Sequence, residues 1–248
     1  MTRSIRIYQP GFYEPHHLVL LDEAAAHHVA VVLRLKVGAK LTLFDGQQHE
    51  YQALIKQIHK KQVWVQIVHQ QWMTRESPYQ LHLWQSLAKN ERMEWLIQKA
   101  VELGVMSITP VLTEHYAQKM DKTRLDKKCQ QWRAIVVSAC EQCGRTIIPE
   151  VKPVITFKAL LADAPKGLNI ALLPQAKTSL LDLPRHYDST HVLIGPEGGF
   201  SQVEQLSLHE AGFLAVQLGP RILRTETAAI AALSVLQAQY GDLTVSHL

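Results

Sequence analysis

The sequence predicts an α/β protein in which a small β-rich domain precedes a larger domain built on a parallel sheet. The spacing of apolar residues changes at a polar, proline-containing segment over residues 71–78. Short strands precede this segment, whereas strands alternate with helices after it, as in a parallel sheet covered on both faces. Two glycine-containing loops directly follow predicted strands of that sheet. We therefore expect one domain over residues 1–73 and a second over residues 74–248.

The first domain is expected to be mainly β. Short apolar segments predict strands at residues 17–21, 41–44, 51–58 and 63–68. The second strand ends in the turn dipeptide Asp45-Gly46, and the last two flank a polar hairpin tip. Residues 24–33 favour a short helix, with Asp22 as its candidate N-cap. Several short strands and one helix are typical of a small barrel.

The second domain alternates strands and helices. Strands are expected at residues 81–87, 105–112, 170–173, 192–194 and 214–218. Helices are expected at residues 91–103, 124–143, 202–211 and 225–240. The first of these helices places Met93, Leu96, Ile97 and Val101 on one face and stops at Gly104, a natural left-handed cap. Ligands of such sheets bind beyond the carboxyl ends of the strands.

Composition and cysteine usage indicate an ordinary globular chain of the cytoplasm. Of the 248 residues, 47% are hydrophobic and 19% are charged, which suffices for a substantial core. No apolar run approaches the roughly 18 residues of a membrane span, and residues 1–10 lack the apolar stretch of a secretory signal. Cys129, Cys140 and Cys143 cannot all pair within one chain, which suits a reducing compartment.

Positive charge is concentrated in the first two-thirds of the chain. Lys and Arg exceed Asp and Glu by 8 to 5 in residues 1–73 and by 11 to 8 in residues 74–148. In residues 149–248, which contain the glycine loops, the 9 acidic residues outnumber the 7 basic ones. The first two-thirds therefore suit an anionic partner better than the last third does. Charge alone, however, favours an ordinary solvated surface.

The two glycine loops together predict a composite ligand site. The first, GPEGG over residues 195–199, lets the backbone approach a ligand closely, but it is neither a P-loop nor a dinucleotide-binding motif. By itself it favours a tight strand-to-helix turn. The second, LGPR over residues 218–221, leads into RTET at 224–227, where Thr225 is the expected N-cap of a helix with free backbone N–H groups. Two such loops in one sheet favour a shared ligand pocket.

The order and spacing of the loops resemble those of the SPOUT methyltransferases, and the amino-acid sequences of the loops resemble those of the RsmE family. Other segments extend this resemblance over nearly the whole chain, namely KNERME at 89–94, QKAVELGV at 98–105, SACEQCGR at 138–145, and His27-His28 with VLRL at 32–35. The last of these resembles a PUA-like domain. The resemblance implies methylation of N3 of a uridine in 16S ribosomal RNA of the small subunit. It also implies a deep C-terminal trefoil knot and a homodimer packed through that knot.

The family resemblance implies that S-adenosylmethionine is bound by backbone and side chains of three segments. Carried over residue by residue, the expected cofactor contacts are Leu172, Leu173, Pro174, Gly195, Pro196, Glu197, Gly198, Gly199, Leu218, Gly219, Arg221, Ile222, Leu223, Arg224, Thr225, Glu226 and Thr227. Methyl transfer to N3 of a uridine requires loss of the N3–H proton, so a uridine anion must be stabilised.

Two arginines and two carboxylates are the candidate catalytic residues. Arg145 and Arg224 are the expected cations, although a phosphate or dimer contact suits each equally well. Glu197 or Glu226 is expected to accept the proton or to orient the base. The RNA is expected to bind through phosphate contacts from basic residues. These are Arg3, Arg6, Arg34, Lys60, Lys61, Lys89 and Arg92.

Three other interpretations compete with this one. A zinc site is not expected, because Cys140 and Cys143 lie at a helix end with only Cys129 to join them. A non-catalytic RNA-binding factor of ribosome assembly would keep the fold with degenerate loops, yet both loops are intact. A SPOUT enzyme acting on a transfer RNA or a ribose hydroxyl fits the second domain, but the resemblance of the first domain argues against it.

Overall fold

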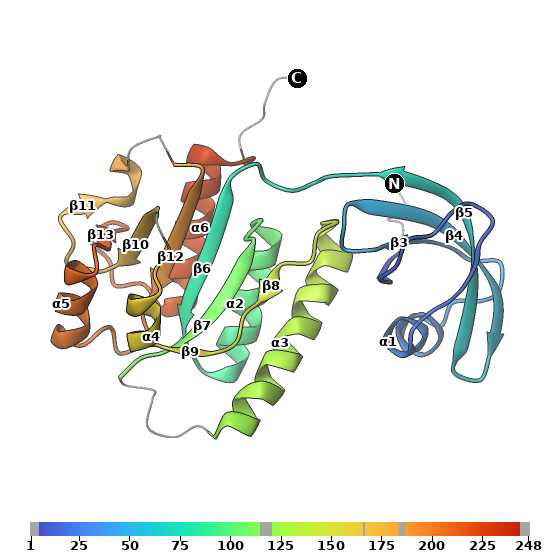
Figure 1. Ribbon diagram of the computed structural model, residues 1–248, viewed down its shortest axis with the longest axis horizontal. Coiled ribbons are helices and arrows are strands. Elements are labelled where there is room, and N and C mark those ends of the chain that lie inside the picture. Colours follow the sequence, from blue (N-terminus) through green and yellow to red (C-terminus); the bar gives the residue numbers. More distant parts are fainter. Residues whose placement is uncertain (1–4, 115–120, 166, 184–186, 244–248) are drawn as a thin grey trace. The chain divides into compact units, whose positions relative to one another are not determined.

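The computed structural model describes residues 5–114, 121–165, 167–183 and 187–243, which form two compact units (Figure 1). The first unit comprises residues 1–76 together with 137–148, and the second comprises residues 77–136 and 149–248. The segment 137–148 is thus distant in sequence from the rest of the first unit. Among the described residues, no helix has the length and apolar character that a bilayer crossing requires.

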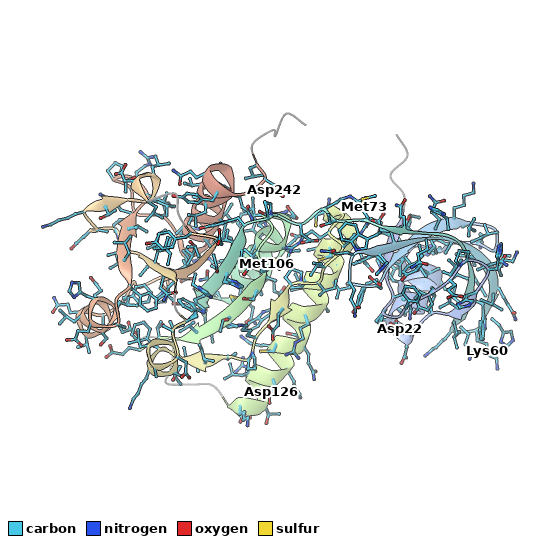
Figure 2. All side chains as sticks on the ribbon, turned by 45° about the horizontal axis from the view of Figure 1, so that its top comes forward. Asp22, Lys60, Met73, Met106, Asp126 and Asp242 are labelled. Carbon is cyan, nitrogen blue, oxygen red and sulfur yellow. The ribbon has the colours of Figure 1, made fainter. Side chains whose placement is uncertain are left out.

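The first unit contains a five-stranded sheet in the order β1-β3-β4-β5-β2. Its strands are β1 Arg6–Tyr8, β2 Leu18–Leu20, β3 Lys40–Phe44, β4 His49–His59 and β5 Gln62–Trp72. All neighbours are antiparallel except β1, which runs parallel to β3. Figure 2 labels Lys60 at the turn between β4 and β5. The predicted hairpin is therefore confirmed, but β5 extends through Trp72, so the predicted linker was too long at its start.

A short helix and one wide helical turn cover the core of the first unit. Helix α1 spans Glu23–His27 and continues into a π-helical turn over His28–Val32. The carboxylate of Asp22 accepts a hydrogen bond of 2.8 Å from the backbone N–H of Ala25, which confirms the predicted N-cap. Alternate residues of β4 and β5 are buried, among them Tyr51, Ile55 and Val65. These side chains form one apolar core under the helix.

The second unit is built on an eight-stranded sheet in the order β11-β13-β10-β12-β6-β7-β8, with β9 paired to β7. All of its pairings are parallel, as predicted. The strands are β6 Gln80–Ser86, β7 Ser107–Leu112, β8 Glu150–Val151, β9 Ile155–Thr156, β10 Leu168–Leu172, β11 Thr178–Ser179, β12 Ser189–Ile194 and β13 Leu214–Gln217.

Helices cover both faces of this sheet (Figure 1). They are α2 Asn90–Glu102, α3 Lys122–Cys143, which extends into the first unit, α4 Phe157–Ala162, α5 Gln202–Glu210 and α6 Thr225–Tyr240, with a 3₁₀ turn at Leu180–Asp182. One face packs Trp84 and Leu193 against α4 and α5. On the other face Gln85 bonds to α6, which packs beside α2. Gly104 ends α2 with a φ of +79°, so the predicted left-handed cap is confirmed.

A stack of aromatic rings on β6 and β12 contains a buried histidine, His191. The ring of His191 lies 4.5 Å from that of His82 and 4.7 Å from that of Trp84, measured between centroids. Burial, with the nearby charges of His82 and Lys152, lowers the pKa of His191 to about 4. Its Nδ1 atom is buried without a hydrogen-bond partner. The folded protein therefore holds the neutral imidazole.

This stack predicts a specific pH dependence of stability. The pKa of His191 is lower in the folded chain than the ordinary value of 6.5 expected after unfolding. Protonation thus favours the unfolded state, and the free energy of unfolding falls as the pH drops from about 6.5 towards about 4. His191→Phe keeps the stacking but cannot titrate, so its urea-unfolding free energy is expected to fall less over this range. Identical pH slopes for the two proteins would contradict the assignment.

Candidate cofactor and active site

A pocket lies at the carboxyl ends of three neighbouring strands of the second unit. It is formed by the segments that follow β10, β12 and β13. Its volume is about 350 Å³, within the range of small-molecule sites. The lining residues are Leu172, Leu173, Pro174, Gln175, Ile194, Gly195, Pro196, Glu197, Gly198, Gly199, Phe200, Gln205, Gln217, Leu218, Gly219, Arg221, Ile222, Leu223, Thr225 and Ala228. The two glycine loops thus line one pocket, as predicted.

Glycines shape the first loop in two ways. At Gly195, a Cβ atom would come within 2.9 Å of the Phe200 ring. Gly199 has a φ of +75°, a backbone conformation that side chains disfavour. The first position therefore needs glycine for space and the second for conformation. Gly219 in the second loop has the same left-handed backbone, with a φ of +70°.

A buried chain of hydrogen bonds joins the first loop to the start of α6. The hydroxyl of Thr225 donates to the carbonyl oxygen of Gly195 at 2.7 Å and accepts from the amide of Gln85 at 2.9 Å. The prediction that Thr225 caps α6 was therefore wrong. Arg224 occupies the N-cap position without a capping side-chain bond, because the hydroxyl of Thr225 is used across the sheet. The first backbone N–H groups of α6 consequently have no side-chain cap.

Most of the expected cofactor contacts line the pocket, and several lining residues were missed. Of the expected residues, only Arg224, Glu226 and Thr227 are not among the lining residues. The missed ones are Gln175, Ile194, Phe200, Gln205, Gln217 and Ala228. Ile194 and Phe200 directly flank the first motif, so their position in the sequence was a usable signal. Gln205 lies on α5 and enters the pocket only through tertiary packing.

Both candidate carboxylates contact one arginine from a distant helix. Nη1 of Arg92, on α2, lies 2.6 Å from a carboxylate oxygen of Glu197 in the first loop. Nε of the same guanidinium lies 3.8 Å from Oε1 of Glu226, in the first turn of α6. The second oxygen of Glu226 is buried without a hydrogen-bond partner. Arg92, predicted as an RNA contact, thus connects both candidate proton acceptors.

Arg145 lies in the first unit and forms a buried ion pair there. Its Nη2 is 2.6 Å from the carboxylate of Glu76, and both side chains are about 95% buried, with exposures of 5% and 6%. The other oxygen of Glu76 accepts the backbone N–H groups of Thr146 and Ile147. Arg6 donates to the carbonyl oxygen of Arg145 at 2.8 Å. The guanidinium of Arg145 therefore has a structural partner within its own unit.

The predicted RNA contacts differ in how accessible they are. Arg34, Lys60, Lys61 and Lys89 are exposed, as phosphate contacts must be. Arg6 is mostly buried in an ion pair with Glu50, which also binds Arg75. Burial alone would raise the pKa of Glu50, but hydrogen bonds and charge from Arg75 and Arg6 outweigh it and lower that pKa. Arg3 lies outside the described residues.

The cysteines do not gather into a metal site in the described part of the chain. There, no three His, Cys, Asp or Glu side chains are placed to hold an ion. Cys129 and Cys140 are buried, and Cys143 is half-buried. Burial raises the pKa of the Cys140 thiol to about 12. That thiol is therefore protonated and unreactive at neutral pH.

The fold and pocket define an α/β protein that binds a small ligand at the carboxyl edge of a parallel sheet. Two family models match, one described as an RNA methyltransferase domain over residues 75–237 and one as an RNA methyltransferase PUA domain over residues 21–68. A ribosomal RNA small subunit methyltransferase E from Buchnera aphidicola is 38% identical over 98% of this chain and 99% of its own length. The chain belongs to the RNA methyltransferase family, in the group named ribosomal RNA small subunit methyltransferase E.

Two solved structures share the whole fold. A methyltransferase from Legionella pneumophila, in complex with bound S-adenosylmethionine, is 48% identical with a TM-score of 0.95, over 98% of this chain and 100% of its own. The ribosomal RNA small subunit methyltransferase E of Neisseria gonorrhoeae, also bound to S-adenosylmethionine, is 35% identical with a TM-score of 0.89, over the same shares. The resemblance to the RsmE family is therefore confirmed.

Proposed function

We propose that this chain transfers a methyl group from S-adenosylmethionine to N3 of a uridine in 16S ribosomal RNA of the small subunit. The observation that carries the proposal is the single pocket lined by both glycine loops at the carboxyl edge of the sheet. Relatives with 48% and 35% identity have S-adenosylmethionine bound, and their folds match this one over nearly the whole chain.

The pocket residues suit S-adenosylmethionine in space and in chemistry. Gly195 leaves no room for a side chain, and Gly199 and Gly219 expose backbone where an adenine or amino-acid group needs hydrogen bonds. Leu172, Leu173 and Leu218 supply apolar contacts. The α6 N-terminus, without a side-chain cap, suits a carboxylate. Bound there, the cofactor supplies an electrophilic methyl group on sulfur.

The protein's own part is to position the acceptor base and to remove its proton. Glu197 lines the pocket, Glu226 contacts the same arginine, Arg92, from the first turn of α6, and either carboxylate is a candidate to accept the N3–H proton. Arg224, exposed at the start of α6, is a candidate to stabilise the uridine anion. The uridine must leave its stack to reach the pocket. Exposed Arg34, Lys60, Lys61 and Lys89 are proposed to bind RNA phosphates.

The proposal includes the knot, the barrel, the homodimer and the cytoplasmic location expected of the family. The match to the RNA methyltransferase family model over residues 75–237 supports the knotted C-terminal region that the family resemblance implies. The antiparallel sheet of the first unit supports a PUA-like barrel. Val203, Leu206 and Ile222 are exposed apolar side chains on α5 and the second loop, and they suit a dimer interface.

Nucleoside analysis of cellular RNA tests the proposed function. Mass spectrometry of small-subunit RNA from cells that lack this chain is expected to show one missing 3-methyluridine. Re-expression of the chain is expected to restore it, whereas a variant without cofactor binding is not. An unchanged nucleoside content would contradict the proposal. Loss of a ribose methylation instead would favour a different reaction of the same fold.

Two matched variants distinguish a catalytic role of Arg145 from a purely structural one. Arg145→Ala and Glu76→Gln each break the same buried ion pair, so each is expected to lower the unfolding free energy, by about 3 kcal/mol. If Arg145 acts directly on the substrate, only Arg145→Ala abolishes turnover. Thermal unfolding and single-turnover assays measure the two effects. A folded Arg145→Ala protein with intact turnover and normal binding of both ligands excludes the catalytic role.

A further inference from the structure

Arg92 contacts one carboxylate of the first loop and one carboxylate in the first turn of α6. It lies on α2, whose neighbouring residues Met93 and Leu96 are fully buried and fix the helix on the sheet. Its guanidinium is 2.6 Å from Glu197 and 3.8 Å from Glu226. Arg92 itself does not line the pocket, whereas Glu197 does. A planar guanidinium with several N–H donors can hold two carboxylates in a fixed geometry.

Glu226 has one oxygen committed to this contact and one that is not. Its Oε1 faces Arg92, and its Oε2 is buried without a hydrogen-bond partner. A buried carboxylate oxygen without a partner is costly, so it favours a donor that arrives with a ligand. The adjacent Thr225 is fixed by hydrogen bonds to Gly195 and Gln85, so the backbone at Glu226 is held in place.

We infer that Arg92 is a positioning residue of the acceptor site and that Glu226 is the proton acceptor it holds. The inference rests on the proposed function. In the step, the N3–H bond of the uracil breaks and its electron pair stays on nitrogen. The proton forms an O–H bond with Oε2 of Glu226 and later passes to water. Arg92, fixed by its 2.6 Å hydrogen bond to Glu197, attracts Oε1 of Glu226 through the ion pair at 3.8 Å and so holds that carboxylate in place.

The inference assigns Arg92 a different role from an RNA phosphate contact. A phosphate contact acts on RNA affinity, changes its salt dependence and is independent of Glu226. A positioning residue acts on turnover through the group that it holds. Displacement of a reacting group by about 1 Å costs up to about 100-fold in rate. The two roles therefore differ in which kinetic constant changes and in whether the effect depends on Glu226.

The test is a double-mutant cycle with a matched control. Arg92→Gln is expected to lower kcat by about 30- to 100-fold. The KM for RNA and the Kd for S-adenosylmethionine, the latter measured by calorimetry, are expected to stay within about threefold of the wild-type values. Such a change is smaller than the tenfold that corresponds to about 1.4 kcal/mol. Arg92→Lys is expected to recover part of the loss. In a Glu226→Gln background, Arg92→Gln is expected to cause little further loss. The control is Lys99→Gln, on the same helix, equally exposed at 32% but paired with Glu102.

Each other outcome overturns a defined claim. A raised KM for RNA with unchanged kcat assigns Arg92 to phosphate binding and overturns the inference. A loss of kcat that is equally large with and without Glu226→Gln shows that Arg92 does not act through Glu226. A similar loss of kcat in Lys99→Gln shows that the effect comes from any charge change on α2 and not from Arg92 itself. A wild-type chain that binds S-adenosylmethionine but does not methylate uridine N3 overturns the proposed function itself, and with it the inference.

Discussion

Glu226→Gln is expected to reduce methyl transfer by about 100- to 10,000-fold, the usual contribution of a general base. The glutamine keeps the size of the side chain, but it removes the negative charge that attracts Arg92 and cannot take the N3–H proton. Glu226 does not line the cofactor pocket, so S-adenosylmethionine binding is expected to stay nearly unchanged. Single-turnover kinetics with a small-subunit RNA substrate, together with calorimetry, measure both quantities on the same protein.

Glu197→Gln is the matched comparison, because both carboxylates contact Arg92. Glu197 is more exposed than Glu226, with 36% against 14% of its side-chain surface accessible. Proton transfer gains from a water-poor surrounding, which favours Glu226 as the acceptor. If Glu197→Gln abolishes turnover and Glu226→Gln does not, the two roles are reversed. Full activity of both variants would show that neither carboxylate is the general base.

Gly195→Val is expected to weaken S-adenosylmethionine binding by about 100-fold or more, equivalent to about 2.8 kcal/mol. A Cβ atom there meets the Phe200 ring at 2.9 Å, and two further methyl groups crowd the same space. The ring or the loop must shift, and both line the pocket. Overpacking of this kind displaces side chains rather than being absorbed by the structure.

Phe200→Leu provides the rescue that identifies the cause. The closest ring atom, Cε2, is absent in leucine, so Gly195→Val with Phe200→Leu is expected to bind the cofactor better than Gly195→Val alone. Calorimetry measures the affinities, and circular dichroism checks that each protein is folded. Unchanged affinity in folded Gly195→Val would show that the first loop does not contact the cofactor.

Long periodic elements and adjacent motifs could be predicted from the sequence. Helix α6 has the predicted bounds because one continuous apolar pattern follows the second loop. The loop pocket was predictable because carboxyl ends of parallel strands share an edge, so GPEGG and LGPR had to approach one another. Most of the shortest elements were not predicted, although the three-residue strand β2 was. Strand β1 has three residues and β8 two, too few for any period to appear.

Contacts that depend on tertiary packing could not be predicted from the sequence either. Nothing in the apolar pattern of α3 indicates that its last residues belong to the first unit, because the helix continues unbroken across that point. The hydroxyl of Thr225 suits a cap locally, yet Gly195 and Gln85 compete for it across the sheet. Arg92 lies in a motif that resembles the family, but its contacts with Glu197 and Glu226 depend on where α2 packs.

The most direct test is a reaction of purified chain with small ribosomal subunits and S-adenosylmethionine that carries a deuterated methyl group. The RNA is then digested, and its nucleosides are separated by liquid chromatography and mass spectrometry. The account predicts one labelled 3-methyluridine per subunit with the wild-type chain and none with Gly195→Val. Label on a ribose, on another base, or on no nucleoside despite cofactor binding would contradict it.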